Sequence, residues 1–262
     1  SWVEFGPAWR YGMTRMGSGL LLTGRPLVES AMLVQYLGFG GAGIYGRAIG
    51  IATIACARIP SYLTRPLYPV LSRLPAGTPA QRRAGTLVVQ SILWLIVPMA
   101  AVMLALAEPI IRMLYGTRWL EATPLIPLAL LLTGLSALNE ALGIMQLASG
   151  RQRACLVADL VASGGLVVAL PVLLPYGVLT YLGGAVVAQV ASMGVKVVDL
   201  SRAEALDFGR LVGVAGMPVL ASACLLAVSA PLWLRLPVAF WSPLWIGIFS
   251  VGFGVAYVVL LR

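Results

Sequence analysis

The chain contains no histidine and only 3 cysteines among its 262 residues. The cysteines, Cys56, Cys155 and Cys224, each lie alone in an apolar stretch. Protein zinc and haem sites are built largely from histidine and cysteine, so the sequence predicts no metal site and no cofactor. Each thiol is expected to be a buried, free apolar group rather than half of a disulfide.

Charge is also scarce. Charged residues make up 10% of the chain, against about 25% in soluble proteins, and hydrophobic residues make up 60%. The mean hydropathy of +0.94 excludes a soluble domain and indicates an integral membrane protein. The formal charge is +9, but the cations lie at segment ends or inside apolar stretches, which does not indicate nucleic-acid binding. The expected acidic partners are membrane lipid headgroups and a phosphorylated substrate.

Apolar segments long enough to span a membrane recur along the whole chain. There are eight, at about 16–37, 43–66, 86–107, 122–148, 154–174, 176–198, 211–234 and 236–261. They predict an all-α polytopic bundle of about eight transmembrane helices. The chain begins at Ser1 without a recognisable signal peptide, and we expect a larger protein that has lost its N-terminal part.

The loop cations predict the orientation of the bundle. On the N-terminal side lie Arg10, Arg73, Arg82, Arg83, Arg151, Arg153, Lys196, Arg202, Arg210 and Arg262; the opposite side has Arg112, Arg118 and Arg235. Cytoplasmic loops carry the excess of Lys and Arg, so both termini are predicted to be cytoplasmic. The even number of predicted helices agrees with this orientation, because it returns the chain to the side on which it started.

Three arginines, Arg47, Arg58 and Arg65, lie in the second apolar segment. If residues 43–71 form one α-helix, spacings of 11 and 7 residues close to about three and two turns, so the three side chains share a face. The stripe would span about 27 Å, close to the hydrocarbon thickness. Cations at such depths usually face a wet cavity or an anion, and guanidinium groups suit phosphate oxygens. The stripe therefore predicts a substrate-binding wall for a lipid-linked anion.

The stripe also has a structural interpretation. Arg47 and Arg65 could extend to the two membrane interfaces as anchors. Pro60 and Pro66 could break the helix and separate the side chains from a common face.

Arg25 and Glu29 lie on one face of the first segment because they are four residues apart. They could neutralise each other inside the bundle. Alternatively, Glu29 could hold a cavity arginine and release it to the substrate, which makes both residues substrate-binding candidates. Pro26 and Gly24 indicate a local kink, and transporter sites often use broken helices.

Three further polar residues lie inside apolar segments. Glu140 and its neighbour Asn139 are candidates for coupling to a proton or sodium ion, because a membrane carboxylate such as that of Glu140 usually has a function. Glu140 could equally make a helix–helix hydrogen bond. Asp159 is expected to pair with the nearby loop cations Arg151 and Arg153.

Four motifs resemble one family of membrane proteins. They are Tyr45-Gly46-Arg47-Ala48, the stretch from Arg65-Pro66-Leu67-Tyr68-Pro69 to Leu74, the turn Ala107-Glu108-Pro109-Ile110-Ile111-Arg112 with Tyr115-Gly116, Trp119 and Pro124, and the loop Gly150-Arg151-Gln152-Arg153. In this order and spacing they resemble the polysaccharide-type, Wzx-like oligosaccharide flippases of the multidrug/oligosaccharidyl-lipid/polysaccharide exporter superfamily. The similarity covers about residues 10–155. The chain departs from the family pattern at Gly50, often basic in relatives, and at Arg58, usually apolar there.

The resemblance implies an architecture. Such flippases usually have 14 helices in two six-helix lobes followed by two extra helices, and the segments here resemble helices seven to fourteen. Residues 1–200 would then form the second lobe and residues 201–262 the two additional helices. The first lobe would be a missing partner.

The resemblance also implies a function. The chain would flip a polyprenyl-pyrophosphate-linked oligosaccharide across the bacterial cytoplasmic (inner) membrane for cell-envelope polysaccharides such as lipopolysaccharide, and it would not be an enzyme. One alternative is a multidrug or cation exporter of the same superfamily, which an arginine-lined cavity disfavours. The other is a membrane glycosyltransferase or polymerase, which would need paired carboxylates or a metal in a large aqueous loop. The loops hold no such pair.

Overall fold

The computed structural model describes residues 2–64, 67–75, 77–203, 213, 216–224, 250, 252–255 and 257. In this part of the chain every regular element is helical, which confirms the predicted all-α fold. The elements are α1 (Trp2–Thr53), a π-helical turn η1 (Ile54–Arg58), α2 (Ile59–Thr64), α3 (Leu67–Leu71), α4 (Pro79–Ala105), α5 (Ala107–Leu114), a 3-10 helix η2 (Thr117–Leu125), α6 (Ile126–Ala148), α7 (Gln152–Leu173), η3 (Leu174–Tyr176) and α8 (Val178–Arg202).

Five helical stretches among the described residues are long and apolar enough to cross a membrane. They are Thr23–Tyr62, Pro79–Ala105, Thr117–Ala148, Gln152–Tyr176 and Val178–Arg202. The chain is therefore a multi-pass membrane protein. The predicted segments 211–234 and 236–261, and with them the proposed division at residue 201, lie largely outside the described residues.

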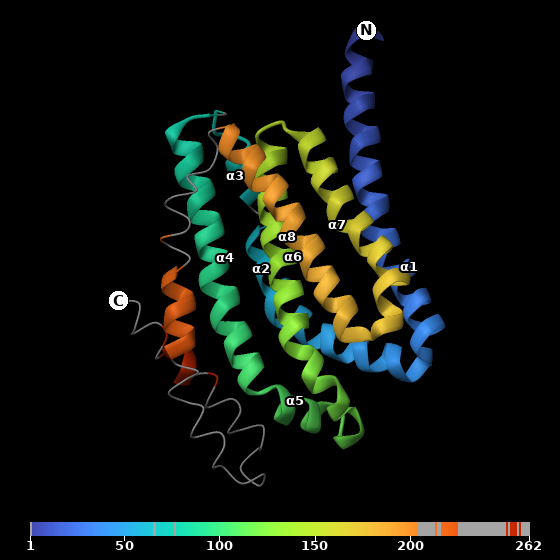
Figure 1. The fold of residues 1–262 in the computed structure, drawn as a ribbon. Helices are drawn as coiled ribbons and strands as arrows, with labels where there is room; N and C mark the ends of the chain where they lie inside the picture. Colours follow the sequence, from blue (N-terminus) through green and yellow to red (C-terminus); the bar gives the residue numbers. More distant parts are fainter. Residues whose placement is uncertain are drawn as a thin grey trace.

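The first stretch is too long for one straight crossing. Its 40 residues would extend about 60 Å, twice the hydrocarbon thickness. Gly38 divides it, with φ 67° and ψ 177°, a backbone conformation that glycine adopts without steric cost. Before the bend α1 descends along the bundle, and after it the chain crosses below the lower ends of α7 and α8 before α2 rises (Figure 1). The predicted segments 16–37 and 43–66 are thus joined by a bend inside a helix rather than by a loop.

The predicted continuous α-helix over residues 43–71 was wrong. Residues 54–58 form a π-helical turn, which adds a residue to the turn and rotates everything beyond it relative to an ideal α-helix. Pro60 follows at once and cannot donate a backbone hydrogen bond. The periodicity that placed Arg47, Arg58 and Arg65 on one face therefore does not hold across this segment.

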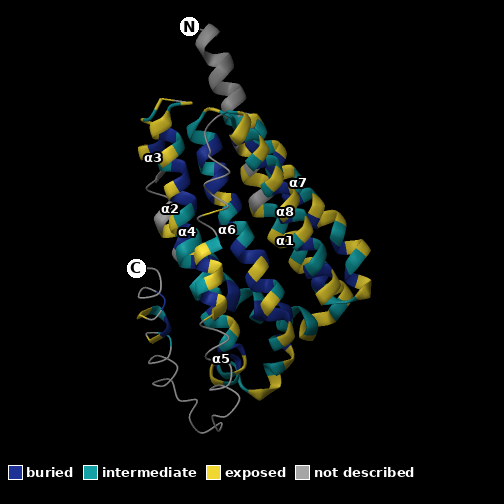
Figure 2. Ribbon diagram, turned by 60° about the vertical axis from the view of Figure 1, so that its left-hand side comes forward, coloured by how far each residue is buried: buried dark blue, intermediate teal, exposed yellow. Residues whose placement is uncertain are grey.

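Helix α6 lies at the centre of the bundle. About 61% of its membrane span is buried, against 28–33% for the other four spans, and buried residues concentrate along it (Figure 2). Its neighbours are α4, α8 and the bent part of α1. Large apolar side chains such as Phe39, Val168 and Val187 face outward, as expected for a lipid-exposed surface.

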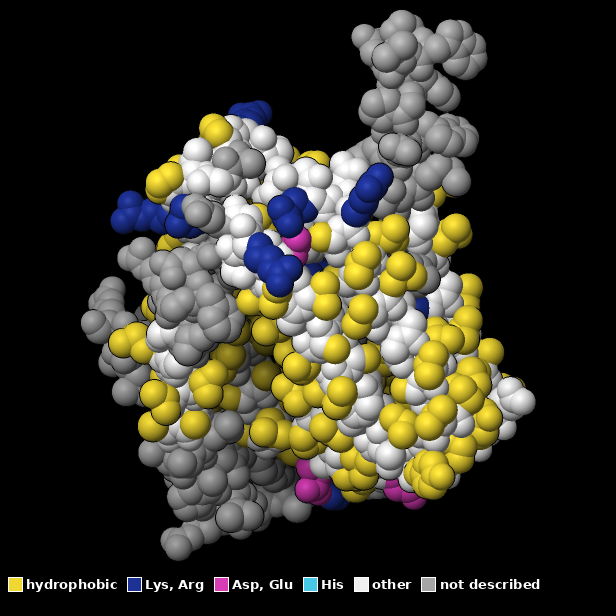
Figure 3. Space-filling view, turned by 45° about the horizontal axis from the view of Figure 1, so that its top comes forward, with side chains coloured by type: hydrophobic (Ala, Val, Ile, Leu, Met, Phe, Trp, Pro, Cys, Tyr) yellow, Lys and Arg dark blue, Asp and Glu magenta, His cyan; other side chains and the backbone are white. Residues whose placement is uncertain are grey.

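The cations gather at one end of the molecule, above a broad apolar surface (Figure 3). At this end lie Arg73 in the α3–α4 connection, Arg82 and Arg83 near the start of α4, Arg151 in the α6–α7 connection and Arg153 at the start of α7. The prediction that Lys196 is a loop cation was wrong, because Lys196 lies inside α8 and only 3% of it is exposed. The remaining asymmetry still predicts that the cation-rich end is cytoplasmic.

Cysteine labelling tests this orientation. We expect a membrane-impermeant maleimide added outside the cell to label Thr117→Cys, in the α5–η2 region, and to leave Ser72→Cys, at the cation-rich end, unlabelled. Both positions are exposed. The background should carry Cys224→Ser, because this thiol is exposed while Cys56 and Cys155 are buried. Labelling of Ser72→Cys alone would reverse the orientation.

Candidate functional site

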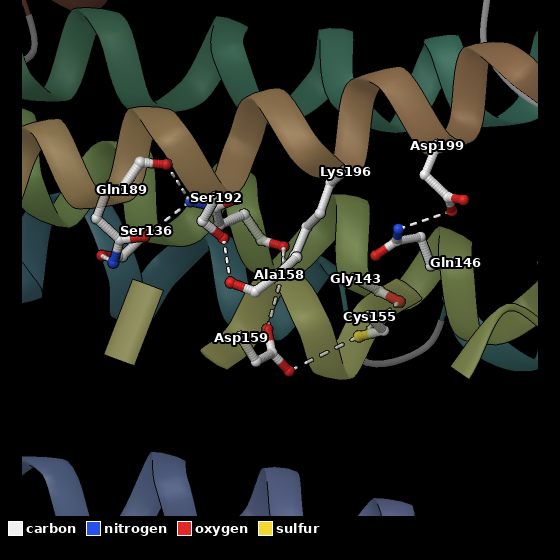
Figure 4. A network of polar contacts seen from close by, with 11 residues as sticks. Ser136, Gly143, Gln146, Cys155, Ala158, Asp159, Gln189, Ser192, Lys196 and Asp199 are labelled. Carbon is white, nitrogen blue, oxygen red and sulfur yellow. Dashed lines mark hydrogen bonds and ion pairs between the residues drawn. The ribbon is translucent and has the colours of Figure 1, made fainter. Parts of the chain in front are cut away.

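A ladder of polar contacts joins α6, α7 and α8 inside the apolar bundle (Figure 4). The Lys196 ammonium on α8 lies 3.0 Å from Asp159 Oδ1 on α7, and it donates to the Asn139 carbonyl oxygen on α6 at 2.9 Å. One cation thus binds groups from two neighbouring helices. A buried lysine needs such compensation, because removing its charge from water without a partner is very costly.

The ladder continues toward the middle of the helices through uncharged groups. Asn139 Nδ2 donates to Gln189 Oε1 at 2.7 Å and to the Gln189 carbonyl oxygen at 3.0 Å. Gln189 Nε2 donates to Ser136 Oγ at 2.7 Å, and Ser192 Oγ donates to the Ala158 carbonyl oxygen at 2.8 Å. Asn139, a predicted coupling residue, therefore makes helix–helix hydrogen bonds to Gln189 of α8.

A second ion pair lies at the cation-rich end of the same helices. Arg151 Nε donates to Asp199 Oδ2 at 2.9 Å, and a second guanidinium nitrogen contacts Asp199 Oδ1, which makes the pair bidentate. Gln146 Nε2 donates to the same carboxylate at 2.9 Å. The hydrogen bond with Asp199 raises the pKa of the Arg151 guanidinium above its ordinary value. The predicted pairing of Asp159 with Arg151 and Arg153 was wrong, because Asp159 pairs with Lys196 and Arg151 with Asp199.

A glycine makes room for the buried lysine. A Cβ added at Gly143 would lie 3.3 Å from Lys196 Nζ, closer than an ordinary van der Waals contact allows. The Cys155 thiol lies beside it, with Sγ 3.9 Å from the Gly143 carbonyl oxygen and 3.7 Å from Asp159 Oδ2. This thiol is buried and forms no disulfide, as predicted, whereas Cys224 is exposed rather than buried.

A polar cavity of about 670 Å³ lies against this ladder, and we call it the central cavity. Its lining comes from five helices: Arg25 of α1, Tyr68 of α3, Ser136, Asn139, Glu140, Gly143, Ile144 and Leu147 of α6, Cys155, Asp159, Ala162 and Ser163 of α7, and Gln189, Ser192 and Lys196 of α8. Asp159 points from α7 toward the α1 side of this space (Figure 4). Ionisable groups in a membrane usually mark a water-filled path or a binding site.

Glu140 differs from Asp159, the other carboxylate that lines the cavity. Its side chain is exposed and lines the central cavity, yet within the described part of the chain it has no hydrogen bond or ion pair. The helix–helix hydrogen bond considered for this residue is therefore absent from the described contacts.

Glu29 joins three segments of the chain at a second polar cluster. Glu29 Oε1 accepts hydrogen bonds from the hydroxyls of Tyr45, which follows the bend in α1, and of Tyr181, at the start of α8; the Tyr181 distance is 2.7 Å. The two rings lie with their centroids 6.1 Å apart. Arg25 Nε lies 3.9 Å from Glu29 Oε2, which confirms that this i, i+4 pair shares a face.

The arginines of the predicted stripe have different surroundings. Arg47 is half-buried, with its guanidinium carbon 4.1 Å from the ring centroid of Trp119 and 5.5 Å from that of Tyr115, so a cation–π contact ties α1 to η2. Arg58 is exposed and lines neither the central cavity nor the 440 Å³ cavity between the two arms of α1. Arg65 lies outside the described residues.

Sequence reasoning missed Lys196, Gln189 and Tyr181. A signal was available for the first two, because Gln189, Ser192, Lys196 and Asp199 are spaced by three or four residues and so share a helix face. Polar residues repeating along one face of an apolar helix indicate a buried polar ladder. Lys196 was counted as a loop cation because it lies near the end of its segment.

Comparisons with known proteins agree with this architecture. Residues 1–124 match the family model described as polysaccharide biosynthesis protein. A solved structure of the lipid II flippase MurJ, in an inward closed conformation, superposes on 95% of the chain with a TM-score of 0.63 at 13% sequence identity. The chain spans about half, 51%, of the length of that structure. A search of the curated proteins returns no match.

These findings confirm the resemblance that the sequence motifs predicted. The family match covers three of the four motifs, and the bundle shares its fold with the solved flippase structure.

The Lys196–Asp159 pair can be tested by its effect on stability. We expect Lys196→Met to lower the free energy of unfolding by about 3 kcal/mol, because it leaves a carboxylate uncompensated between α7 and α8. The double variant Lys196→Met/Asp159→Asn should recover most of that loss. The measurement is thermal unfolding in detergent, with Arg153→Gln, an exposed cation at the same end, as control. Equal stability of Lys196→Met and the control would contradict the assignment.

Proposed function

We propose that this chain forms the substrate-carrying second lobe of a flippase that moves a lipid-linked oligosaccharide across the bacterial cytoplasmic membrane. One observation carries the proposal: a 670 Å³ cavity lined by Arg25, Glu140, Asp159 and Lys196 lies inside an apolar membrane bundle. A headgroup bearing phosphates and sugars needs such a polar environment to cross hydrocarbon.

The mechanism follows from the position of the cavity. The saccharide-pyrophosphate would enter from the cation-rich end, where loop arginines attract it, and its phosphates would meet the Arg25 guanidinium. The polyprenyl tail would stay among the bilayer lipids outside the apolar surface. Rocking of this lobe against an opposing first lobe would then expose the headgroup to the other side. The product would serve the assembly of cell-surface polysaccharides.

In this proposal the partners are the lipid-linked substrate, the membrane lipids and an opposing lobe. The likeness to a structure about twice as long supports the opposing lobe. Flippase-like architecture supports transport rather than enzymatic catalysis. The excess of loop cations at one end supports a cytoplasmic location for both termini.

The predicted substrate residues take different roles in the proposal. Arg25 contacts the phosphates, and Glu29 holds Arg25 in place when no substrate is bound. Arg47 belongs to the wall facing the opposing lobe, and Arg58, which is exposed, meets the headgroup outside the central cavity. Arg65, which lies outside the described residues, stays a candidate from the sequence.

The carboxylate of Glu140, which has no hydrogen bond or ion pair among the described residues, also suits a cationic substrate, as the alternative of a drug or cation exporter requires. Such an exporter would need Glu140 for substrate recognition and would gain nothing from Arg25. The two functions therefore differ in which charge is essential.

Arg25→Ala should reduce transport at least about tenfold, because it removes the main phosphate-binding group facing the cavity. Arg25→Lys should retain part of the activity, since the charge survives although the bidentate geometry is lost. Transport is measured in the producing bacterium as surface polysaccharide and as lipid-linked oligosaccharide accumulating on the inner leaflet. Arg153→Gln serves as the matched control. Full polysaccharide export with Arg25→Ala, at unchanged protein level, would refute the proposal.

Arg58→Ala tests the headgroup contact outside the central cavity separately from the phosphate contact at Arg25. We expect a loss of transport with an unchanged amount of protein in the membrane, and partial activity for Arg58→Lys. Export at the level of the unaltered protein in the Arg58→Ala strain would remove Arg58 from the pathway while leaving the role of Arg25 intact.

A further inference from the structure

Three polar side chains of the central cavity stand apart from its ladder of contacts. Tyr68 on α3, Glu140 on α6 and Ser163 on α7 all line the cavity. Within the described part of the chain, none of these side chains has a hydrogen bond or an ion pair. A group that enters the cavity therefore meets three side chains, from three different helices, whose hydrogen-bonding capacity is unused.

The charges of the cavity leave one carboxylate in excess. Lys196 is paired with Asp159 at 3.0 Å. Arg25 lies 3.9 Å from Glu29, which stands behind it. Glu140 is exposed and is the lining charge that has no counterion among the described residues. A ligand group beside Glu140 is thus favoured if it donates hydrogen bonds, and it is disfavoured if it is itself negative.

The chemistry of the three side chains suits a sugar. A carboxylate accepts hydrogen bonds with both oxygens, and such charge-assisted bonds are stronger than neutral ones. The hydroxyls on neighbouring carbons of a sugar ring present donors in pairs, and the Ser163 hydroxyl can both donate and accept. Tyr68 is 40% exposed, and an aromatic ring offers an apolar face on which the C–H groups of a sugar ring can pack.

We propose that Tyr68, Glu140 and Ser163 form the saccharide subsite of the central cavity, and that Glu140 makes this subsite selective for a sugar without a carboxylate. The sugar hydroxyls donate to Glu140 and bond with Ser163, and the C–H face of the ring packs on Tyr68. A uronic acid would place a second negative charge beside Glu140, in a site of reduced dielectric constant where like charges repel strongly.

The inference rests on the proposed function and deepens it, because it names the class of sugar that follows the pyrophosphate. That sugar is neutral or carries an amino group. Specificity of this kind comes from a repulsive element as well as from attractive contacts.

Two ligands that differ in one group test the selectivity. They are geranyl pyrophosphates whose terminal phosphate is linked to glucose or to glucuronic acid, so that only the group at C6 of the sugar changes. Their affinities for the purified full chain in nanodiscs are measured by calorimetry at neutral pH. We expect the glucose ligand to bind at least about tenfold more tightly than the glucuronic acid ligand. All interactions of the pyrophosphate are common to both ligands and cancel in this ratio.

The charge of Glu140 is tested by a variant of the same size. Glu140→Gln keeps a hydrogen-bond acceptor and removes the negative charge, so the preference for the glucose ligand should fall to near equality. Glu121→Gln, which alters an exposed carboxylate in η2, is the matched control and should keep the full preference. Equal affinities for the two ligands in the unaltered chain, or an unchanged preference in Glu140→Gln, would overturn the inference.

The sugar contact of Tyr68 is tested against a ligand without a sugar. This reference is the methyl ester of geranyl pyrophosphate, which has the same charge as the glucose ligand. Tyr68→Leu should weaken binding of the glucose ligand about fivefold and leave binding of the methyl ester unchanged. Tyr68→Phe keeps the ring and should retain most of the affinity. An equal loss for both ligands in Tyr68→Leu would remove Tyr68 from the saccharide subsite.

The outcomes separate the inference from the proposed function. If the methyl ester binds as tightly as the glucose ligand to the unaltered chain, the saccharide subsite is refuted while the flippase proposal stands. If none of the three ligands binds, both are refuted. Binding of tetraphenylphosphonium that is lost in Glu140→Gln would assign the carboxylate to a cationic substrate and would also overturn the inference.

Discussion

The cost of placing polar groups in hydrocarbon governs this structure. Lys196 can lie inside the bundle only because Asp159 and the Asn139 carbonyl group offset its desolvation. That requirement fixes three helices at once, since the partners come from α6 and α7 while the lysine belongs to α8. The same contacts place the charged side chains against a cavity rather than against lipid. The stability of the bundle and the polarity of its interior thus depend on the same set of contacts.

The bend in α1 shows a similar coupling between backbone and polar contacts. Gly38 lets the helix turn, and the turn brings Tyr45 back toward Glu29 on the first arm. Tyr181 completes the cluster from α8. One carboxylate therefore links both arms of α1 to the lobe. Arg25 lies beside this carboxylate and lines the cavity. A movement of α1 and a change in the cavity would therefore both alter the surroundings of Arg25.

The arginine stripe illustrates where sequence reasoning failed. It assumed 3.6 residues per turn from residue 43 to 71, and one π-helical turn at 54–58 was enough to invalidate the register. Arg47 instead contacts Trp119, a residue 72 positions away in the sequence. Helical periodicity is reliable within a regular segment, but it carries no information about a local change of pitch or about which distant ring a guanidinium meets.

The local features of the sequence were sufficient to predict the class of protein. Low charge and long apolar segments determined a helical membrane bundle, and the order of four motifs predicted its family resemblance, because each of these is a property of consecutive residues. The i, i+4 pairing of Arg25 with Glu29 followed in the same way. Tertiary packing alone decided the partner of Asp159, the lack of a partner for Glu140 among the described residues, and the cavity that both line. Which helices face one another depends on the whole bundle, and a charge buried in a membrane takes whichever partner that packing brings within reach.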